Sequence, residues 1–116
     1  MRLDHVTVLT SDVGATAAFY RDVLGLEPGP RPPFSFAGAW LYAGGTAVVH
    51  LKAPGLGDAP GGVIEHVAFA VDDFDAAVAR LAGRGIPHRL GRLPDGTRRQ
   101  CFLHDPNGAV IELTGD

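Results

Sequence analysis

The chain has 116 residues, of which 46% are hydrophobic and 20% are charged, and its formal net charge is −3 at pH 7. This composition excludes a disordered chain, and no apolar run reaches the roughly 18 residues of a membrane-spanning helix. The negative charge argues against a nucleic-acid partner. The sequence contains a single cysteine, Cys101, so we expect no disulfide framework and a cytoplasmic protein.

The first half begins with a predicted strand and a predicted helix. Residues His5–Leu9 alternate and contain several β-branched side chains, which is typical of a strand. Ser11 or Asp12 is expected to cap a helix that runs to Leu24, and Gly25 is expected to stop it in the left-handed conformation.

The first half then continues with strands. Residues 39–42 and 46–52 are predicted to form a hairpin around the turn Ala43-Gly44-Gly45. Residues 34–36 are a candidate for a further short strand. The proline-rich run over residues 28–33 excludes a helix there.

The second half repeats this order. A strand is predicted over residues 64–71, followed by a helix that Asp73 caps. The turn Asp105-Pro106-Asn107-Gly108 is expected to join the last two strands. The remaining predicted strands cover residues 88–90, 99–103 and 109–114.

Short motifs recur between the two halves at an offset of about 61 residues, which indicates an internal duplication. Asp4-His5-Val6 returns as Glu65-His66-Val67, and Val49-His50-Leu51 returns as Ile111-Glu112-Leu113. We therefore predict an α+β fold of two βαβββ modules that form one cupped mixed sheet. We expect a single domain over residues 1–116, with module one at about 1–52, a linker at about 53–62 and module two at about 63–116.

The duplication makes His5 equivalent to His66, and His50 equivalent to Glu112. If two modules pack about a pseudo-twofold axis, equivalent side chains that face the axis converge there. Three imidazoles and a carboxylate suit a divalent transition metal such as zinc, nickel, cobalt or iron(II). We therefore predict a metal site formed by His5, His50, His66 and Glu112, although a single strand histidine is more often a surface or core residue.

Other side chains are candidates for substrate binding. Aromatic residues of the first half are candidates for one wall of the cup, although they are equally compatible with plain core positions. Adjacent arginines near the start of a later strand offer a clamp for a carboxylate, and only one of the two can face a cavity. The named candidates are Phe34, Phe36, Trp40, Tyr42, Arg98 and Arg99.

Two longer motifs of the chain carry a family resemblance. They are Phe19-Tyr20-Arg21-Asp22-Val23-Leu24-Gly25-Leu26 and Asp105-Pro106-Asn107-Gly108-Ala109-Val110-Ile111-Glu112-Leu113. Together with the two histidine motifs, they resemble the vicinal oxygen chelate superfamily of glyoxalase I, bleomycin resistance proteins, methylmalonyl-CoA epimerase and extradiol dioxygenases. The resemblance implies paired βαβββ modules and a divalent metal held at positions 5, 50, 66 and 112.

The resemblance implies a metal-dependent lyase or isomerase that acts on a small substrate with two vicinal oxygens. We expect Glu112 to be the first candidate for the proton acceptor and His50 the second. Position 50 is glutamate in glyoxalase I and glutamine in the epimerase, whereas this chain has histidine. Two alternatives stay open, namely an iron(II) ring-cleaving dioxygenase and a non-enzymatic drug-binding protein. The family arranges its modules within one chain or between two chains, and we expect a homodimer.

Overall fold

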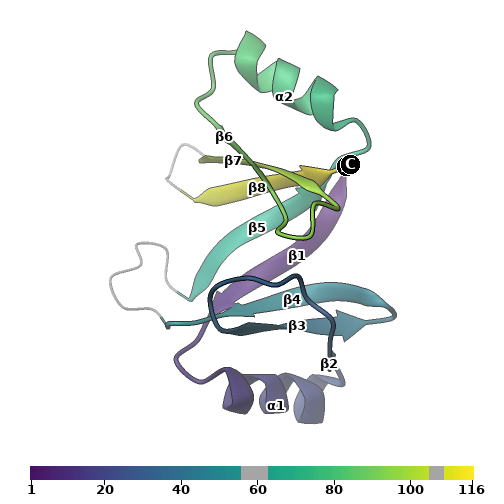
Figure 1. Ribbon diagram of the computed structural model, residues 1–116, viewed down its shortest axis with the longest axis vertical. Helices are drawn as coiled ribbons and strands as arrows, with labels where there is room; N and C mark the ends of the chain where they lie inside the picture. The colour runs from purple at the N-terminus through teal and green to yellow at the C-terminus, as the bar shows by residue number, and fades with distance from the viewer. Residues whose placement is uncertain (56–62, 105–108) are drawn as a thin grey trace. The chain divides into compact units, whose positions relative to one another are not determined.

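A computed structural model describes residues 1–55, 63–104 and 109–116. These residues form two compact units. The N-terminal unit comprises His5–Glu65, and the C-terminal unit comprises Met1–Asp4 with His66–Asp116. Each unit contains one helix and one mixed β-sheet layer (Figure 1). The element order is βαβββ twice, so the predicted α+β class with two such modules is confirmed.

In the N-terminal unit the strands follow the order β2-β3-β4-β1. Strand β1 spans Arg2–Leu9 and begins three residues before the predicted start; its residues Val6–Leu9 pair in parallel with β4. Strand β3 pairs antiparallel with both β2 and β4. The bounds of these strands are Glu27–Gly29 for β2, Gly38–Ala43 for β3 and Thr46–Lys52 for β4.

The predicted hairpin between β3 and β4 is confirmed, with a two-residue turn at Gly44 and Gly45. Their φ angles are 55° and 83°, so both residues adopt the left-handed backbone that a tight hairpin of this kind needs. Glycine is the residue that adopts this conformation without a steric penalty.

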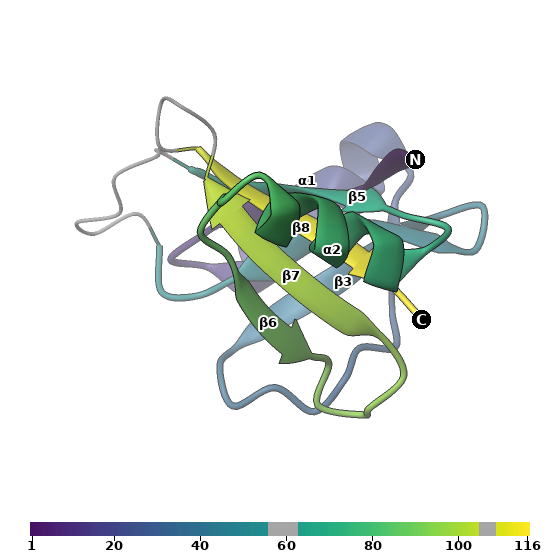
Figure 2. The same ribbon diagram turned by 90° about the horizontal axis from the view of Figure 1, so that it is seen from above.

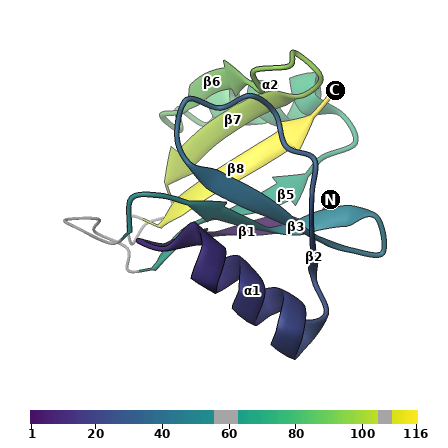
Figure 3. The same cartoon turned by 60° about the horizontal axis from the view of Figure 1, so that its bottom comes forward.

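Helix α1 spans Val13–Leu24 and lies against β2, β3 and β4 of its own unit (Figure 3). The Asp12 side chain accepts a hydrogen bond from the amide of Ala15 at 2.9 Å, so Asp12 is the N-cap. Gly25 ends the helix with φ of 75°. The predicted start and stop of this helix are both confirmed.

The candidate strand over residues 34–36 is wrong, because no strand forms there and residues 35 and 36 form a bend. The additional strand is β2, which pairs with β3 through Glu27 and Gly29. Three prolines at positions 30, 32 and 33 lack the amide donor that a strand ladder needs, so the chain leaves the sheet after Gly29.

In the C-terminal unit the strands follow the order β5-β8-β7-β6. Strands β5 and β8 are parallel, and β7 is antiparallel to both β6 and β8. The predicted turn over residues 105–108 and most of the predicted linker lie outside the described residues. The strand bounds are Ile64–Ala70 for β5, Arg89–Arg92 for β6, Arg99–His104 for β7 and Val110–Gly115 for β8.

Helix α2, Phe74–Gly83, covers one face of this layer (Figure 2). The Asp73 side chain caps it by accepting from the amide of Ala76 at 2.9 Å, as predicted. Phe74, Cys101 and Leu113 form the buried core between helix and strands. None of the described helices is long and apolar enough to span a membrane.

Side chains alternate along each strand, so each layer has two chemically different faces. On β7, Cys101 belongs to the apolar core beneath α2. Gln100 and Phe102 therefore lie on the other face, where Phe102 is in register with Glu112 of β8. Burial raises the pKa of the Cys101 thiol.

We expect Gly38→Ala to destabilise the protein by about 2 kcal/mol or more, because a Cβ at Gly38 would lie 2.2 Å from the backbone oxygen of Leu51. Gly83→Ala is the matched control, since it adds the same methyl group in a helix where nothing lies within 4 Å. We expect Gly83→Ala to be neutral or to stabilise by up to about 1 kcal/mol. Urea unfolding of both variants measures the difference, and equal stabilities would contradict it.

Candidate functional site

The candidate site of the C-terminal unit is built around the carboxylate of Glu112 in β8. Glu112 is only 3% exposed. Its Oε1 accepts a hydrogen bond from the Gln100 side-chain amide at 3.2 Å and lies 3.5 Å from Nε2 of His66. The Phe102 ring stands edge-on to the His66 ring, with centroids 6.2 Å apart. Three neighbouring strands thus bring an imidazole, a carboxylate and an amide together.

The separation of His66 and Glu112 suits two ligands of one metal ion. Two donor atoms that each lie about 2.1 Å from an ion, at tetrahedral or octahedral angles, are about 3.0–3.4 Å apart. The observed 3.5 Å between Nε2 and Oε1 is close to this range. Nitrogen and carboxylate oxygen donors are also the chemistry that transition metals prefer. The residues therefore fit a divalent metal.

The other two predicted ligands, His5 and His50, meet in the N-terminal unit. His5 lies on β1 and His50 on β4, and their rings stack with centroids 3.7 Å apart and planes 12° apart. On its other side, the His50 ring stacks on Trp40 of β3 at 4.0 Å. The strand register explains the arrangement. Thr7 of β1, His50 and Trp40 are aligned across three strands, and His5 lies two residues before Thr7, on the same face of β1.

This stacking limits how His5 and His50 can bind metal. An ion bound by an imidazole nitrogen lies near the plane of that ring. Two rings stacked in nearly parallel planes 3.7 Å apart do not share a plane, so one ion does not lie in both. The arrangement therefore favours one of the two imidazoles as a ligand and leaves the other as its neighbour.

The stack continues through further aromatic side chains. The Phe34 ring lies 6.2 Å from Trp40 and 4.8 Å from Phe36, measured between centroids. Of the predicted aromatic residues, Tyr42 is not part of this stack, because its hydroxyl donates to the carbonyl of Pro30 and its ring covers Gly29. We use the name aromatic ladder for His5, His50, Trp40, Phe34 and Phe36.

The two arginines expected to clamp a substrate have protein partners. Arg98 Nη1 lies 3.3 Å from a carboxylate oxygen of Asp4. Arg99 donates from Nη1 to Asp75 at 2.8 Å and from two further nitrogens to the carbonyl of Asp116. Its guanidinium also lies 4.5 Å from the centre of the Phe74 ring.

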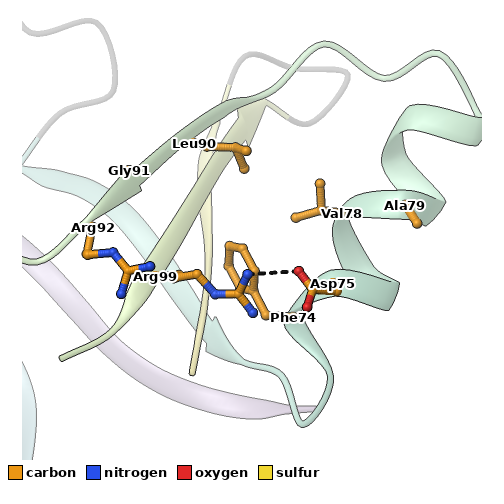
Figure 4. Close-up of a pocket in the computed structure, with 8 residues that line it drawn as sticks. All are labelled: Phe74, Asp75, Val78, Ala79, Leu90, Gly91, Arg92 and Arg99. Atoms are coloured by element: carbon orange, nitrogen blue, oxygen red, sulfur yellow. Dashed lines mark hydrogen bonds and ion pairs between the residues drawn. The ribbon is translucent and has the colours of Figure 1, made fainter. Parts of the chain in front are cut away.

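Arg99 lies on the helix-covered face, away from the face that carries Gln100 and Phe102. There it lines a pocket of about 580 Å³ between α2 and strands β6 and β7 (Figure 4). The Asp75–Arg99 ion pair stands within this pocket. The pocket is therefore on the opposite side of the C-terminal layer from Glu112.

Two residues that the sequence reasoning did not select lie beside the predicted ones. Gln100 contacts Glu112, and Arg31 lies against the Phe34 and Phe36 rings. The signal for Gln100 was available, because it alternates with Cys101 and so shares a face with the neighbouring strand's carboxylate. No strand or helix pattern places Arg31, because it belongs to the irregular segment between β2 and β3.

Known proteins resemble the whole of this chain. A family model described as the Glyoxalase/Bleomycin resistance protein/Dioxygenase superfamily matches residues 2–113. Ethylmalonyl-CoA/methylmalonyl-CoA epimerase of Cereibacter sphaeroides is 30% identical, with 97% of this chain and 96% of the relative aligned. Lactoylglutathione lyase of Salmonella typhimurium is 29% identical, over 97% of this chain and 91% of the relative.

A solved structure extends the similarity to the fold. Streptomyces coelicolor methylmalonyl-CoA epimerase in complex with 2-nitronate-propionyl-CoA has a TM-score of 0.74 and 27% identity, covering 98% of this chain and 93% of the other. Paired βαβββ modules are thus shared by this chain and a structure of an enzyme of this class. The chain belongs to the glyoxalase/bleomycin resistance/dioxygenase superfamily, which is the vicinal oxygen chelate superfamily that the sequence motifs predict.

The Asp75–Arg99 pair predicts a pH-dependent contribution to stability. The hydrogen bond and charge of Arg99 lower the pKa of Asp75 in the folded protein. The pair therefore stabilises the folded state above the unfolded pKa of about 3.9, and this contribution is lost as the pH falls through the lower folded value. Asp75→Asn removes it.

We expect wild type to be slightly more stable than Asp75→Asn at pH 7 and to lose that advantage near pH 2–3. Urea unfolding at both pH values measures it. Asp22→Asn is the comparison for an exposed arginine pair within one helix, because Arg21 and Asp22 are adjacent on α1. A difference between wild type and Asp75→Asn that persists unchanged at low pH would contradict the expectation.

Proposed function

We propose that the protein is a metal-dependent isomerase or lyase that moves a proton between adjacent carbon atoms of a small substrate with two vicinal oxygens. The observation that carries the proposal is the buried carboxylate of Glu112, which lies beside an imidazole nitrogen and accepts from an amide. Similarity to lactoylglutathione lyase and to methylmalonyl-CoA epimerase supports the reaction class.

We propose that His5, His66 and Glu112 hold one divalent transition metal. The duplication supports this set, because it makes His5 equivalent to His66, and the spacing of His66 and Glu112 suits two ligands of one ion. His50 becomes a fourth ligand only if its ring leaves the stack with His5 and Trp40. Zinc, nickel, cobalt and iron(II) match these donors.

When bound, the ion supplies positive charge that polarises the two oxygens of the substrate and makes the neighbouring C–H group more acidic. Glu112 is the first candidate to accept that proton and return it to the adjacent carbon. His50 is the second candidate, since its imidazole lies next to His5 and imidazole is a common proton acceptor in enzymes. Gln100 holds Oε1 of Glu112 by donating a hydrogen bond to it.

A second candidate function is an iron(II) dioxygenase that cleaves aromatic rings. Two histidines and one carboxylate form the ligand set of such enzymes, and His5, His66 and Glu112 offer the same residue types. A third candidate is a protein that binds an aromatic drug without chemistry, and the aromatic ladder favours it. The homodimer and the cytoplasmic location stay predictions.

We expect His5→Ala and His66→Ala each to lose tight binding of zinc, nickel or cobalt. We expect His50→Ala to retain the ion with affinity reduced by about 10- to 100-fold, which is the loss typical of a residue beside the ligand set. Metal analysis after dialysis measures the stoichiometry, and quenching of Trp40 fluorescence by nickel or cobalt follows the titration.

His88→Ala is the control for the metal titration, because its Nδ1 lies 2.9 Å from the backbone oxygen of Ile86 and it is no member of the proposed set. Binding that is unaffected by both His5→Ala and His66→Ala would refute the site. Binding lost with His50→Ala as completely as with His5→Ala would make His50 a ligand.

We expect Glu112→Gln to lower turnover by roughly 10²–10⁴-fold, because it removes the proton acceptor but keeps an oxygen that Gln100 can reach. The substrates to assay are the glutathione hemithioacetal of methylglyoxal and methylmalonyl-CoA, which the names of the relatives suggest. Exposed Glu27 of β2 provides the matched control, Glu27→Gln, which we expect to leave turnover unchanged.

Two outcomes would replace the isomerase proposal. Ring cleavage by the wild type that requires oxygen and iron(II), without isomerase turnover, would favour the dioxygenase. Absence of turnover with every metal, together with tight binding of an aromatic compound to metal-free protein, would favour the binding protein.

A further inference from the structure

The aromatic ladder begins at the candidate ligand His5 and ends at a cation. The guanidinium carbon of Arg31 lies 5.0 Å from the centre of the Phe34 ring and 5.3 Å from that of Phe36. Phe34 contacts Trp40, Trp40 stacks on His50, and His50 stacks on His5. Arg31 and the whole ladder belong to the N-terminal unit, so each of these contacts lies within one compact unit.

The bonding of Arg31 differs from that of the other arginines described above. Arg98 and Arg99 each contact a carboxylate, whereas Arg31 is in no ion pair with any residue that the structure describes. Its hydrogen bond to the protein runs from Nη2 to the carbonyl of Phe36 at 3.1 Å. The buried Nε has no acceptor among the described residues. A guanidinium has five N–H donors, so Arg31 keeps donors that no described residue accepts from.

A second cation near the ladder is already neutralised. The Lys52 ammonium lies 5.1 Å from the centre of the Phe36 ring, but it also forms an ion pair with Glu65 at 2.9 Å. An anion approaching this end of the ladder therefore meets its strongest attraction at Arg31.

We propose that Arg31 binds the anionic group of a planar organic ligand whose flat part packs beside Phe34 and Phe36, at the end of the aromatic ladder. A guanidinium binds carboxylates and phosphates through paired, charge-assisted hydrogen bonds, and aromatic faces favour flat groups stacked on them. The inference deepens the proposed function, on which it rests, by naming the substrate class. That class is a planar organic anion.

The test uses the full chain without added metal, so that it does not depend on turnover. trans-Cinnamate and its neutral amide, cinnamamide, share one flat framework and differ in charge. Trp40 is the only tryptophan of the sequence and lies within the ladder, so its fluorescence reports binding of either compound. Phenyl phosphate added as a third probe distinguishes a phosphate from a carboxylate as the preferred anion.

We expect wild type to bind at least one of the two anions about 10- to 100-fold more tightly than cinnamamide, the range of a charge-assisted hydrogen bond. Arg31→Gln should remove this preference and leave cinnamamide binding within about twofold. Arg31→Lys should keep part of it. Arg92→Gln is the matched control, since Arg92 is an arginine of the C-terminal unit that donates to the carbonyl of Gly96.

Equal affinity of wild type for both anions and cinnamamide would overturn the inference, and so would an unchanged preference in Arg31→Gln. If Arg31→Gln fails to fold, the affinities of wild type for the two anions and for cinnamamide still test the inference. Failure of the proposed function is distinguishable, because loss of metal binding and turnover would leave the preference for anions in the metal-free protein intact.

Discussion

Burial of the Glu112 carboxylate is the constraint on which the C-terminal unit depends. A carboxylate that is 3% exposed is costly to ionise unless donors surround it. The sheet supplies these neighbours from strands on both sides, with Gln100 on β7 and His66 on β5. Small Ala68 occupies the register position next to Glu112 on β5 and leaves room for the longer side chains. The position of Glu112 thus determines which residues its neighbouring strands must carry.

Strand alternation then separates two kinds of chemistry on one layer. Cys101 and Leu113 face α2 and form the apolar core, while Gln100 and Glu112 face the other way. Arg99 follows the core side of β7, where Asp75 and Phe74 hold it. A shift of one residue in the register of β7 would turn Cys101 to the face of Glu112 and Gln100 to the face of α2. The same shift would bring Arg99 to the face of Glu112.

The sequence predicted what depends on local pattern and repetition. Both helix caps, the Gly44–Gly45 hairpin and the order of helices and strands along the chain follow from residues that are close to one another in the sequence. The meeting of His5 with His50 follows from the duplication only in part, since the stack with Trp40 depends on how β1, β4 and β3 align. The bend at residues 35 and 36 and the place of Arg31 depend on packing within and after the proline-rich run, which has no helix or strand periodicity.

The two modules have kept one topology and acquired different side-chain chemistry. Position 112 places a carboxylate where amide and imidazole donors reach it, whereas the equivalent position 50 places a flat ring between two other rings. A carboxylate at position 50 would lack that stacking, and an imidazole at position 112 would not accept from Gln100 in the same way. The C-terminal unit therefore offers an imidazole nitrogen and a carboxylate oxygen side by side, which are donors of the kind that transition metals take. The N-terminal unit, with its aromatic ladder ending at Arg31, is suited to receiving a flat, negatively charged molecule.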